Sequence, residues 1–176
     1  MQRLFTLFFF SFLIVTAFSQ TRYKDEVFSI TKHTDIQYGS NYDSKNQLTN
    51  LLMDIYEPQN DTASMRPIIF FVHGGSFVGG SRTDQDINET AEFFAKKGYV
   101  TANIEYRVQQ TTLISPYLDF GNANNWYRAI TRATHDLKAA IRYIKKDVAT
   151  NNNFYKVDTN TIFIYGSSAG AISVLH

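Results

Sequence analysis

Short apolar runs and longer segments of helical periodicity alternate along most of the chain. Residues 27–32 (VFSITK) and 50–56 (NLLMDIY) predict two strands, separated by a polar segment rich in turn-forming residues. Residues 67–73 (PIIFFVH) form a continuous apolar run, which is typical of a strand buried on both faces of a parallel sheet. The first part of the chain therefore predicts three strands.

A helix and a fourth strand follow this apolar run. Residues 86–97 (DINETAEFFAKK) predict the helix, with Asp86 and Glu89 at the spacing of a capping box and Gly98 as the C-cap. Residues 99–106 (YVTANIEY) predict the strand. A helix between two buried strands indicates a βαβ unit, in which the two strands are parallel.

The longest helical pattern covers residues 125–147. Its apolar positions recur at helical spacing and basic residues fall on the other side, so we expect one face to pack on a sheet. Residues 161–165 (TIFIY) then predict a strand that leads through GSSAG into AISVL, the start of a further helix. The predicted fold class is therefore α/β, with a mostly parallel sheet flanked by helices. The apolar positions of the long helix are Ile130, Ala133, Leu137, Ala140, Ile141 and Ile144, and the basic ones are Arg128, Arg132, Lys138, Arg142 and Lys145.

The N-terminal segment, residues 1–19 (MQRLFTLFFFSFLIVTAFS), differs from the rest of the chain. Arg3 provides a positive start, residues 4–18 are almost wholly apolar, and Ala17 and Ser19 are small residues where a signal peptidase reads them. We expect a signal peptide with cleavage before Gln20, and a secreted or periplasmic protein. The alternative is a membrane anchor, which about 15 apolar residues are too short to form, since a span needs ~20. No stable membrane span is then expected after cleavage.

Composition and charge narrow the class of function. The chain is 44% apolar and 19% charged, as is usual for one globular domain. Removal of Arg3 with the signal peptide lowers Lys+Arg from 17 to 16, which equals the 16 Asp+Glu. Without net charge or a basic run, the sequence does not support nucleic-acid binding or electrostatic docking on membranes. The chain has no cysteine and so no disulfide.

The segment Gly166-Ser167-Ser168-Ala169-Gly170 fits the pattern G-x-S-x-G and makes Ser168 a candidate nucleophile. A strand that reverses sharply into a helix needs glycines beside the serine, because a side chain there would clash with the neighbouring strand or helix. The turn places the serine hydroxyl at a helix N-terminus, where partial positive charge favours developing anions. The predicted strand before the motif and the predicted helix after it are the context that this chemistry requires.

A second candidate element is His73-Gly74-Gly75-Ser76-Phe77, which follows the apolar run at 67–73. Acyl transfer needs N–H donors preorganised around a tetrahedral oxyanion. Glycines directly after a buried strand allow the backbone to approach the substrate closely enough. We predict an oxyanion hole made by the N–H groups of Gly74, Gly75 and Ala169, with Ser76 as a further candidate.

With these motifs the chain resembles the α/β-hydrolase fold. HGGSF followed by GSSAG, with DLKAAIRYIKKD between them and VDTNTIFIYGSSAGA around the serine, is similar to the carboxylesterase and hormone-sensitive-lipase-like group, whose usual forms are HGGG and GDSAGG. The resemblance covers residues 50–176. Ser76 replaces the third glycine but still has an amide, so the oxyanion role is retained. Ser167 replaces a common acidic residue, an exchange that we expect to tune substrate or stability.

The resemblance also implies where the rest of a catalytic triad lies. In this family an Asp or Glu and then a His follow the nucleophile in the chain. His73 has a structural role there, orienting the oxyanion loop, and His176 lies ~12 Å along the same helix from Ser168. The remaining histidines and acids considered, His33, His135, Asp136 and Asp158, are interpreted as structural or surface residues.

We therefore expect the acid and the histidine beyond residue 176. Residues 20–176 would then be the N-terminal part of one α/β-hydrolase domain, truncated after the serine motif and nearly inactive alone. Because further parallel strands would normally lie beside it, TIFIY is expected to form an exposed apolar edge.

The predicted function of the complete protein is that of a serine carboxylesterase, which cleaves carboxylic esters through an acyl-enzyme and needs no cofactor or metal. Its substrate would be a small ester or an acylated polymer, in a pocket walled partly by the loop at 107–125. Two alternatives stay open. A peptidase or amidase on the same fold would share every residue named here, and a non-catalytic binding module would have lost the triad.

Overall fold

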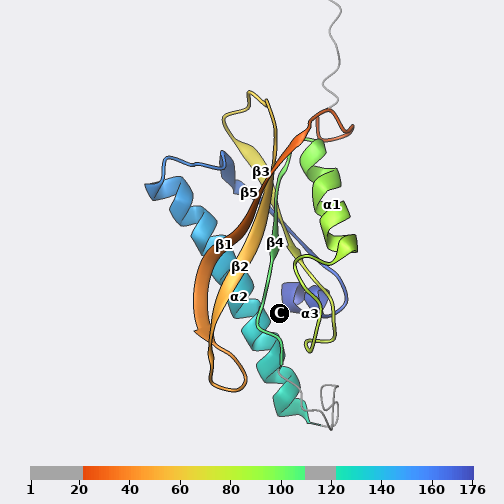
Figure 1. Cartoon of the computed structure of the whole chain (residues 1–176), viewed down its shortest axis with the longest axis vertical. Coiled ribbons are helices and arrows are strands. Elements are labelled where there is room, and N and C mark those ends of the chain that lie inside the picture. The colour runs from red at the N-terminus through yellow and green to blue at the C-terminus, as the bar shows by residue number, and fades with distance from the viewer. Residues whose placement is uncertain (1–21, 110–121) are drawn as a thin grey trace, which may run out of the picture.

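The computed structural model describes residues 22–109 and 122–176 (Figure 1). The predicted signal peptide and most of the loop predicted to wall the substrate pocket lie outside these residues. The elements in chain order are β1 (Ile30–Tyr42), β2 (Leu48–Pro58), β3 (Arg66–Val72), α1 (Gln85–Lys96), β4 (Val100–Ile104), α2 (Ala123–Thr150), β5 (Val157–Gly166) and α3 (Ala169–Leu175).

The five strands form one sheet in the order β1-β2-β4-β3-β5. β1 pairs antiparallel with β2, and β2 pairs antiparallel with β4. β3 pairs parallel with both β4 and β5, so the predicted βαβ unit is confirmed. The predicted α/β-hydrolase class with flanking helices is confirmed as well, and the described sheet is mixed, with parallel pairing at β3 and antiparallel pairing at β2. Because β3, β4 and β5 are parallel, the segments that leave their carboxyl ends meet at the same edge of the sheet.

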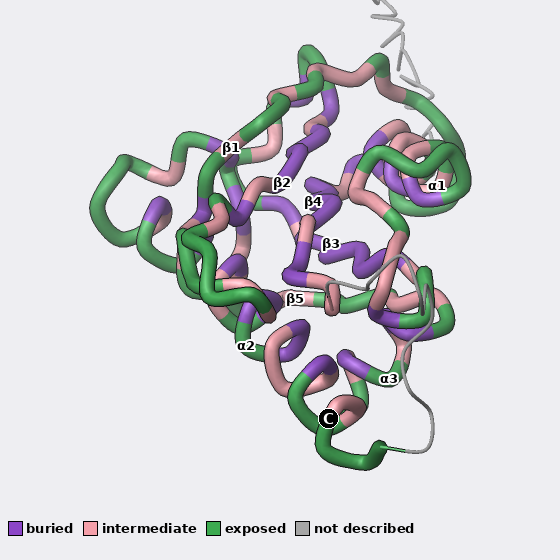
Figure 2. The backbone as a smooth tube through the Cα atoms, turned by 60° about the horizontal axis from the view of Figure 1, so that its bottom comes forward, coloured by how far each residue is buried: buried purple, intermediate pink, exposed green. Residues whose placement is uncertain are grey.

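Helices cover both faces of the sheet, which is why β3 is apolar from Pro67 to Val72 (Figure 2). Ile68, Phe70 and Val72 belong to the larger core, which includes residues of α2 and α3. The alternate residues Ile69 and Phe71 belong to a smaller core with α1. The side-chain alternation of one strand therefore supplies both cores, as the continuous apolar run at 67–73 predicts.

The prediction that a turn-rich segment separates the first two strands is wrong over most of that segment's length. β1 continues to Tyr42 and pairs with β2 down to Leu48. The turn itself is short, and the Asp43 carboxylate accepts the backbone N–H groups of Lys45 and Gln47 at 2.8 Å each. β1 has a polar sequence because it is an edge strand with solvent access, so a strand can form there without an apolar run.

The first helix begins one residue earlier than predicted, and its predicted cap is wrong. The N-cap is Asp84, whose side chain makes no capping hydrogen bond, and Asp86 lies in the first turn. Glu89 accepts a hydrogen bond from the Gln85 side chain in place of a capping-box contact. Gly98 follows the helix with φ of +107° and donates its N–H to Ala95, as predicted for a C-terminal glycine.

The second helix is longer than predicted at both ends. Asn122 caps it by accepting the N–H groups of Asn124 and Asn125. Its buried residues include Ala133, Leu137 and Ile144, so the predicted apolar face is the one that packs on the sheet. Within residues 22–109 and 122–176 no helix is both long enough and apolar enough to cross a membrane.

β5 lies at the edge of the described sheet, next to β3 only. Phe163, Ile164 and Tyr165 are exposed large apolar side chains on this strand. The expectation that TIFIY presents an apolar edge therefore agrees with the position of the strand in the sheet.

Candidate active site

The candidate nucleophile lies in a strained turn between β5 and α3. We name residues 166–170 the serine turn. Ser168 has φ of 49° and ψ of −113°, a backbone conformation that residues with a side chain rarely adopt. Such strain costs about 1–3 kcal/mol and persists only where the surrounding structure imposes it. Here β5 on one side and α3 on the other fix both ends of the turn.

The strained backbone of Ser168 predicts how two substitutions at this position differ in stability. The free energy of unfolding of Ser168→Gly is expected to be about 1 kcal/mol higher than that of Ser168→Ala, so the glycine variant is the more stable. Glycine adopts positive φ without a steric cost, whereas alanine does not. Urea unfolding of the two variants of the complete protein, both of which lack the hydroxyl, measures this difference. Equal midpoints would show that the turn carries no strain at this position.

Steric contacts explain why glycines are required on both sides of Ser168. A methyl group at Gly166 would lie 2.5 Å from the backbone nitrogen of Ala171, inside α3. A methyl group at Gly170 would overlap the carbonyl oxygen of Val72 and lie 2.7 Å from that of His73. The first glycine therefore makes room for the helix and the second for strand β3, which is the reason that the sequence pattern suggests.

The second candidate element lies directly beside the serine turn. We name residues 73–80, which follow β3, the glycine loop. A methyl group at Gly74 would lie 3.3 Å from the Cβ of Ser168 and 3.3 Å from the carbonyl oxygen of Ser167. The parallel pairing of β3 with β5 brings the two motifs together, because both leave their strands at the same edge of the sheet.

The glycine loop itself has an unusual backbone. Gly75, Ser76 and Phe77 all have positive φ, at 108°, 53° and 61°. A methyl group at Gly75 would overlap the carbonyl oxygen of Gly79, so this position needs glycine on two grounds. The loop is closed by the N–H groups of Val78 and Gly79, which both donate to the Gly75 carbonyl at 3.0 Å.

Four backbone N–H groups at this corner have no acceptor within residues 22–109 and 122–176. Those of Gly74, Gly75, Ser76 and Ala169 donate no hydrogen bond to any residue of the described part of the chain. Ala169 is the first residue of α3, where N–H groups have no intrahelical partner. The described residues therefore bring to one place a serine hydroxyl and several amide donors that have no partner among them.

His73 is buried and faces the glycine loop. Its Nδ1 lies 2.7 Å from the Gly74 carbonyl oxygen, and its ring stacks on that of Tyr106 with centroids 4.2 Å apart. Its Nε2 lies 3.2 Å from Oε1 of Glu105, close enough for an ion pair but without hydrogen-bond alignment. Both ring nitrogens thus face residues other than Ser168, consistent with a structural role.

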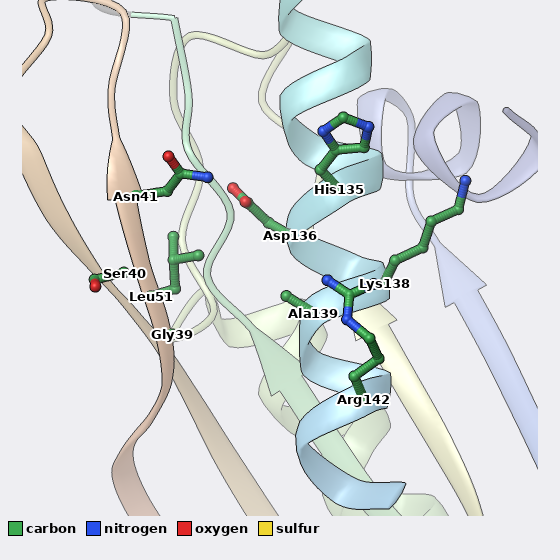
Figure 3. A pocket seen from close by; sticks show the side chains of 9 residues that line it. All are labelled: Gly39, Ser40, Asn41, Leu51, His135, Asp136, Lys138, Ala139 and Arg142. Carbon is green, nitrogen blue, oxygen red and sulfur yellow. The ribbon is translucent and has the colours of Figure 1, made fainter. Parts of the chain in front are cut away.

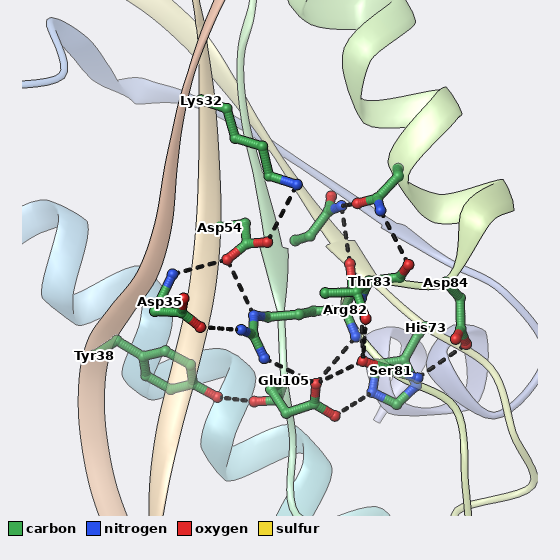
Figure 4. Close-up of polar contacts among 12 residues, drawn as sticks. Lys32, Asp35, Tyr38, Asp54, His73, Ser81, Arg82, Thr83, Asp84 and Glu105 are labelled. Atoms are coloured by element: carbon green, nitrogen blue, oxygen red, sulfur yellow. Dashed lines mark hydrogen bonds and ion pairs between the residues drawn. The ribbon is translucent and has the colours of Figure 1, made fainter.

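Glu105 connects the two ends of the glycine loop (Figure 4). Its Oε1 faces His73, while its Oε2 accepts the Ser81 hydroxyl at 3.2 Å and the Arg82 N–H at 3.1 Å. The Arg82 side chain continues the network to the buried Asp54 on β2. Burial alone would raise the pKa of Glu105, but the His73 ring and the Arg82 N–H outweigh it and hold that pKa below its usual value.

None of the other three histidines forms a hydrogen bond with Ser168 among the described residues. His33 bonds Glu57 at 2.8 Å, and the ring of His176 contacts that of Tyr127. His135 lines a cleft of about 530 Å³ between the β1–β2 hairpin and α2 (Figure 3). The lining of this cleft includes no residue of the serine turn or the glycine loop.

The two carboxylates considered in the sequence are occupied elsewhere. Asp136 is buried and binds the guanidinium of Arg107 through both oxygens, with contacts down to 2.7 Å. Asp158 accepts the N–H of Asn160 and the hydroxyl of Thr161. The described residues therefore bring no histidine or acid to Ser168, and they contain no group of three or more His, Asp or Glu placed to hold a metal.

Sequence reasoning missed Glu105 and Tyr106. Their position in the sequence could have indicated a role at the site, since both directly follow strand β4. The carboxyl end of β4 lies beside that of β3, where the glycine loop begins. Arg82, at the far end of the loop, carried no signal in the sequence because its partners, Asp35 on β1, Asp54 on β2 and Glu105 after β4, are distant in the chain.

Comparison with known families finds one family model that spans both motifs. The family model described as BD-FAE matches residues 53–175, which include the glycine loop and the serine turn. Among curated proteins, carboxylesterase 3B of Mus musculus is 30% identical over 125 residues, which are 70% of this chain and 19% of that protein. Gut esterase 1 of Caenorhabditis elegans is 28% identical over 138 residues, 77% of this chain and 21% of that protein. The chain thus spans about a fifth of the length of these relatives.

Solved structures of similar fold include those of an esterase. The apo form of Thermogutta terrifontis esterase 2 is 24% identical, with a TM-score of 0.58 over 80% of this chain and 44% of that one. A structure of the same enzyme phosphorylated by paraoxon gives a TM-score of 0.57, over 81% of this chain and 45% of that one, at 24% identity. The arrangement of strands and helices is therefore that of these α/β-hydrolases.

Proposed function

Because this chain belongs to the BD-FAE family of α/β-hydrolase esterases, we propose that the complete protein hydrolyses carboxylic esters with Ser168 as its nucleophile. The observation that carries the proposal is the strained backbone of Ser168 directly beside the glycine loop. A fold that keeps a serine at φ of 49° does so at a cost in stability, which a chemical role for its hydroxyl explains.

The proposed reaction proceeds through an acyl-enzyme. The Ser168 oxygen attacks the ester carbonyl carbon while its proton passes to a histidine base. The carbonyl oxygen becomes an oxyanion, which accepts hydrogen bonds from the N–H groups of Gly74, Gly75 and Ala169, with Ser76 as a further donor. The alcohol leaves with the proton from the histidine, and water then attacks the acyl group and regenerates Ser168. No metal ion or cofactor takes part in this proposal.

The base and its orienting acid are proposed to follow residue 176 in the complete protein. The four histidines of this chain have other neighbours, and its acids likewise give Ser168 no partner among the described residues. Family order places an Asp or Glu and then a His after the nucleophile. Residues 20–176 without them would be nearly inactive, because a serine hydroxyl without a base is a weak nucleophile at neutral pH.

We further propose that the enzyme is exported. Residues 1–19 have the layout of a signal peptide, so the mature protein would begin at Gln20 and meet its substrate, a small ester or an acylated polymer, outside the cytoplasm. The N-terminal sequence of the protein recovered from the periplasm or medium tests this, and an uncleaved Met1 would contradict it.

The function is tested with a fluorophosphonate probe on the complete protein. Paraoxon phosphorylates the esterase of similar fold, and a serine activated by a base is expected to react in the same way. We expect one covalent adduct, mapped by peptide mass spectrometry to Ser168. A folded protein that takes up no probe would overturn the proposal and would favour a non-catalytic binding module.

Matched ester and amide substrates distinguish an esterase from the remaining alternative, a peptidase or amidase. An esterase is expected to hydrolyse a p-nitrophenyl ester much faster than the corresponding anilide, because the amide is the less reactive carbonyl compound. Comparable kcat/KM values for the two substrates would indicate a peptidase or amidase on the same fold.

A further inference from the structure

We propose that Tyr106 and Glu105 are positioning residues, which aim the Gly75 N–H at the oxyanion by holding the carbonyl of Gly74 in place. This inference rests on the proposed function. Neither residue touches the reacting atoms, and both act through the backbone of the glycine loop.

The Gly74 carbonyl oxygen receives two donors from buried rings. Nδ1 of His73 lies 2.7 Å from it, and because a carbonyl oxygen only accepts, this nitrogen carries the proton. The Tyr106 hydroxyl lies 3.2 Å from the same oxygen and 3.0 Å from the carbonyl oxygen of His73. One hydroxyl proton is therefore shared between two successive carbonyl groups of the loop.

Fixing this oxygen also fixes the next N–H group. The peptide bond between Gly74 and Gly75 is planar and trans, so its C=O and N–H point in opposite directions. Donors that hold the Gly74 oxygen on the His73 side therefore point the Gly75 N–H in the opposite direction, away from His73, within the same peptide plane. Without them the two glycines could rotate, because neither has a side chain that restricts its backbone.

The tyrosine is itself held rigidly. Tyr106 is buried, its ring lies within 16° of parallel to the His73 ring, and the ring of Phe77 packs edge-on with centroids 6.3 Å apart. Phe77 also belongs to the glycine loop, so Tyr106 contacts both the start and the middle of that loop. A buried hydroxyl in such a setting has a defined direction, unlike one that is free to rotate in water.

Glu105 holds the other side of the His73 ring and the far end of the loop. Its Oε1 lies 3.2 Å from Nε2, so the carboxylate is next to the side of the ring that faces away from Gly74. Its second oxygen binds Ser81 and the N–H of Arg82, where the chain leaves the loop (Figure 4). One side chain on the segment after β4 thus bridges both ends of the element that supplies the donors.

The test compares two tyrosine variants of the complete protein. Tyr106→Phe removes only the hydroxyl and keeps the ring stacked on His73. We expect kcat to fall about 10-fold with KM unchanged, because misdirecting one oxyanion donor weakens binding in the transition state alone. Tyr56→Phe is the matched control, since Tyr56 is also buried and loses one hydrogen bond, to Asn88 of α1 at 2.7 Å, which is not a residue of the glycine loop. Its kcat is expected to stay within twofold.

A boronic acid that mimics the tetrahedral intermediate gives a readout that a loss of stability alone would not move. Its affinity is expected to fall for Tyr106→Phe by about the same factor as kcat/KM, and to be unchanged for Tyr56→Phe. An equal kcat for wild type and Tyr106→Phe would overturn the inference while leaving the proposed function intact. A wild type that neither cleaves esters nor reacts with the fluorophosphonate would overturn both.

Two variants at position 105 keep the inference testable if Tyr106→Phe fails to fold. Glu105→Gln retains an oxygen acceptor for Ser81 and Arg82, whereas Glu105→Ala removes all contacts with the loop. We expect kcat to fall for both, and more for Glu105→Ala, with partial rescue by the glutamine. Equal and unchanged kcat values for the two variants would contradict a positioning role for Glu105.

Discussion

Replacing Ser168 with alanine is expected to lower kcat for ester hydrolysis by the complete protein about 10⁴-fold or more and to abolish labelling by a fluorophosphonate. The variant keeps the amide donors of the glycine loop and of Ala169, so a small residual rate above that of water should persist. Steady-state kinetics and the covalent adduct, measured on the same preparation, check both parts of the prediction.

Ser167→Ala is the matched control for this variant. Ser167 is the neighbouring residue, and its backbone N–H, which the substitution keeps, donates to the Val72 carbonyl at 3.1 Å. Its hydroxyl forms no hydrogen bond within the described residues, so we expect a change in kcat of less than threefold. A loss at position 167 as large as at 168 would mean that the turn, and not the Ser168 hydroxyl, accounts for the effect.

Gly170→Ala is expected to cost about 4 kcal/mol or more in the free energy of unfolding, and most of the protein should fail to fold. The added methyl group would overlap the Val72 carbonyl oxygen and approach that of His73 to 2.7 Å. Both oxygens belong to the backbone where β3 ends, so no side chain can move away to relieve the clash. Relief requires α3 to move away from the sheet, and that movement also displaces Ala169.

Gly79→Ala provides the control for this glycine. A methyl group at Gly79 meets no atom within 4 Å, and the residue does not have positive φ. We expect the free energy of unfolding to change by less than about 0.5 kcal/mol. Urea unfolding followed by circular dichroism measures both variants. Similar midpoints for the two would contradict the close approach of α3 to β3.

Local patterns were enough to predict most elements of the fold. The apolar run at 67–73, the periodicity at 125–147 and the glycine at position 98 all predict structure correctly, because burial on a sheet and the end of a helix impose local constraints on residue type. The edge strand β1 was predicted too short, since a strand with solvent on one side needs no apolar sequence. The cap at Asp86 was wrong by two residues, because the capping box is a weak preference that the chain before the helix can override.

The amino-acid pattern alone identifies the residues with which this protein could act and the local shape around them. A serine between two glycines, after a strand and before a helix, already requires a tight turn, for which backbone sterics are sufficient. The sequence did not reveal how the glycine loop is held. Only the tertiary structure, through parallel pairing of β3 with β4 and β5, brings Glu105 and Tyr106 against His73 and places Gly74 beside Ser168. Such contacts join segments that are distant in the chain, and they depend on strand order, which no local pattern of residues encodes.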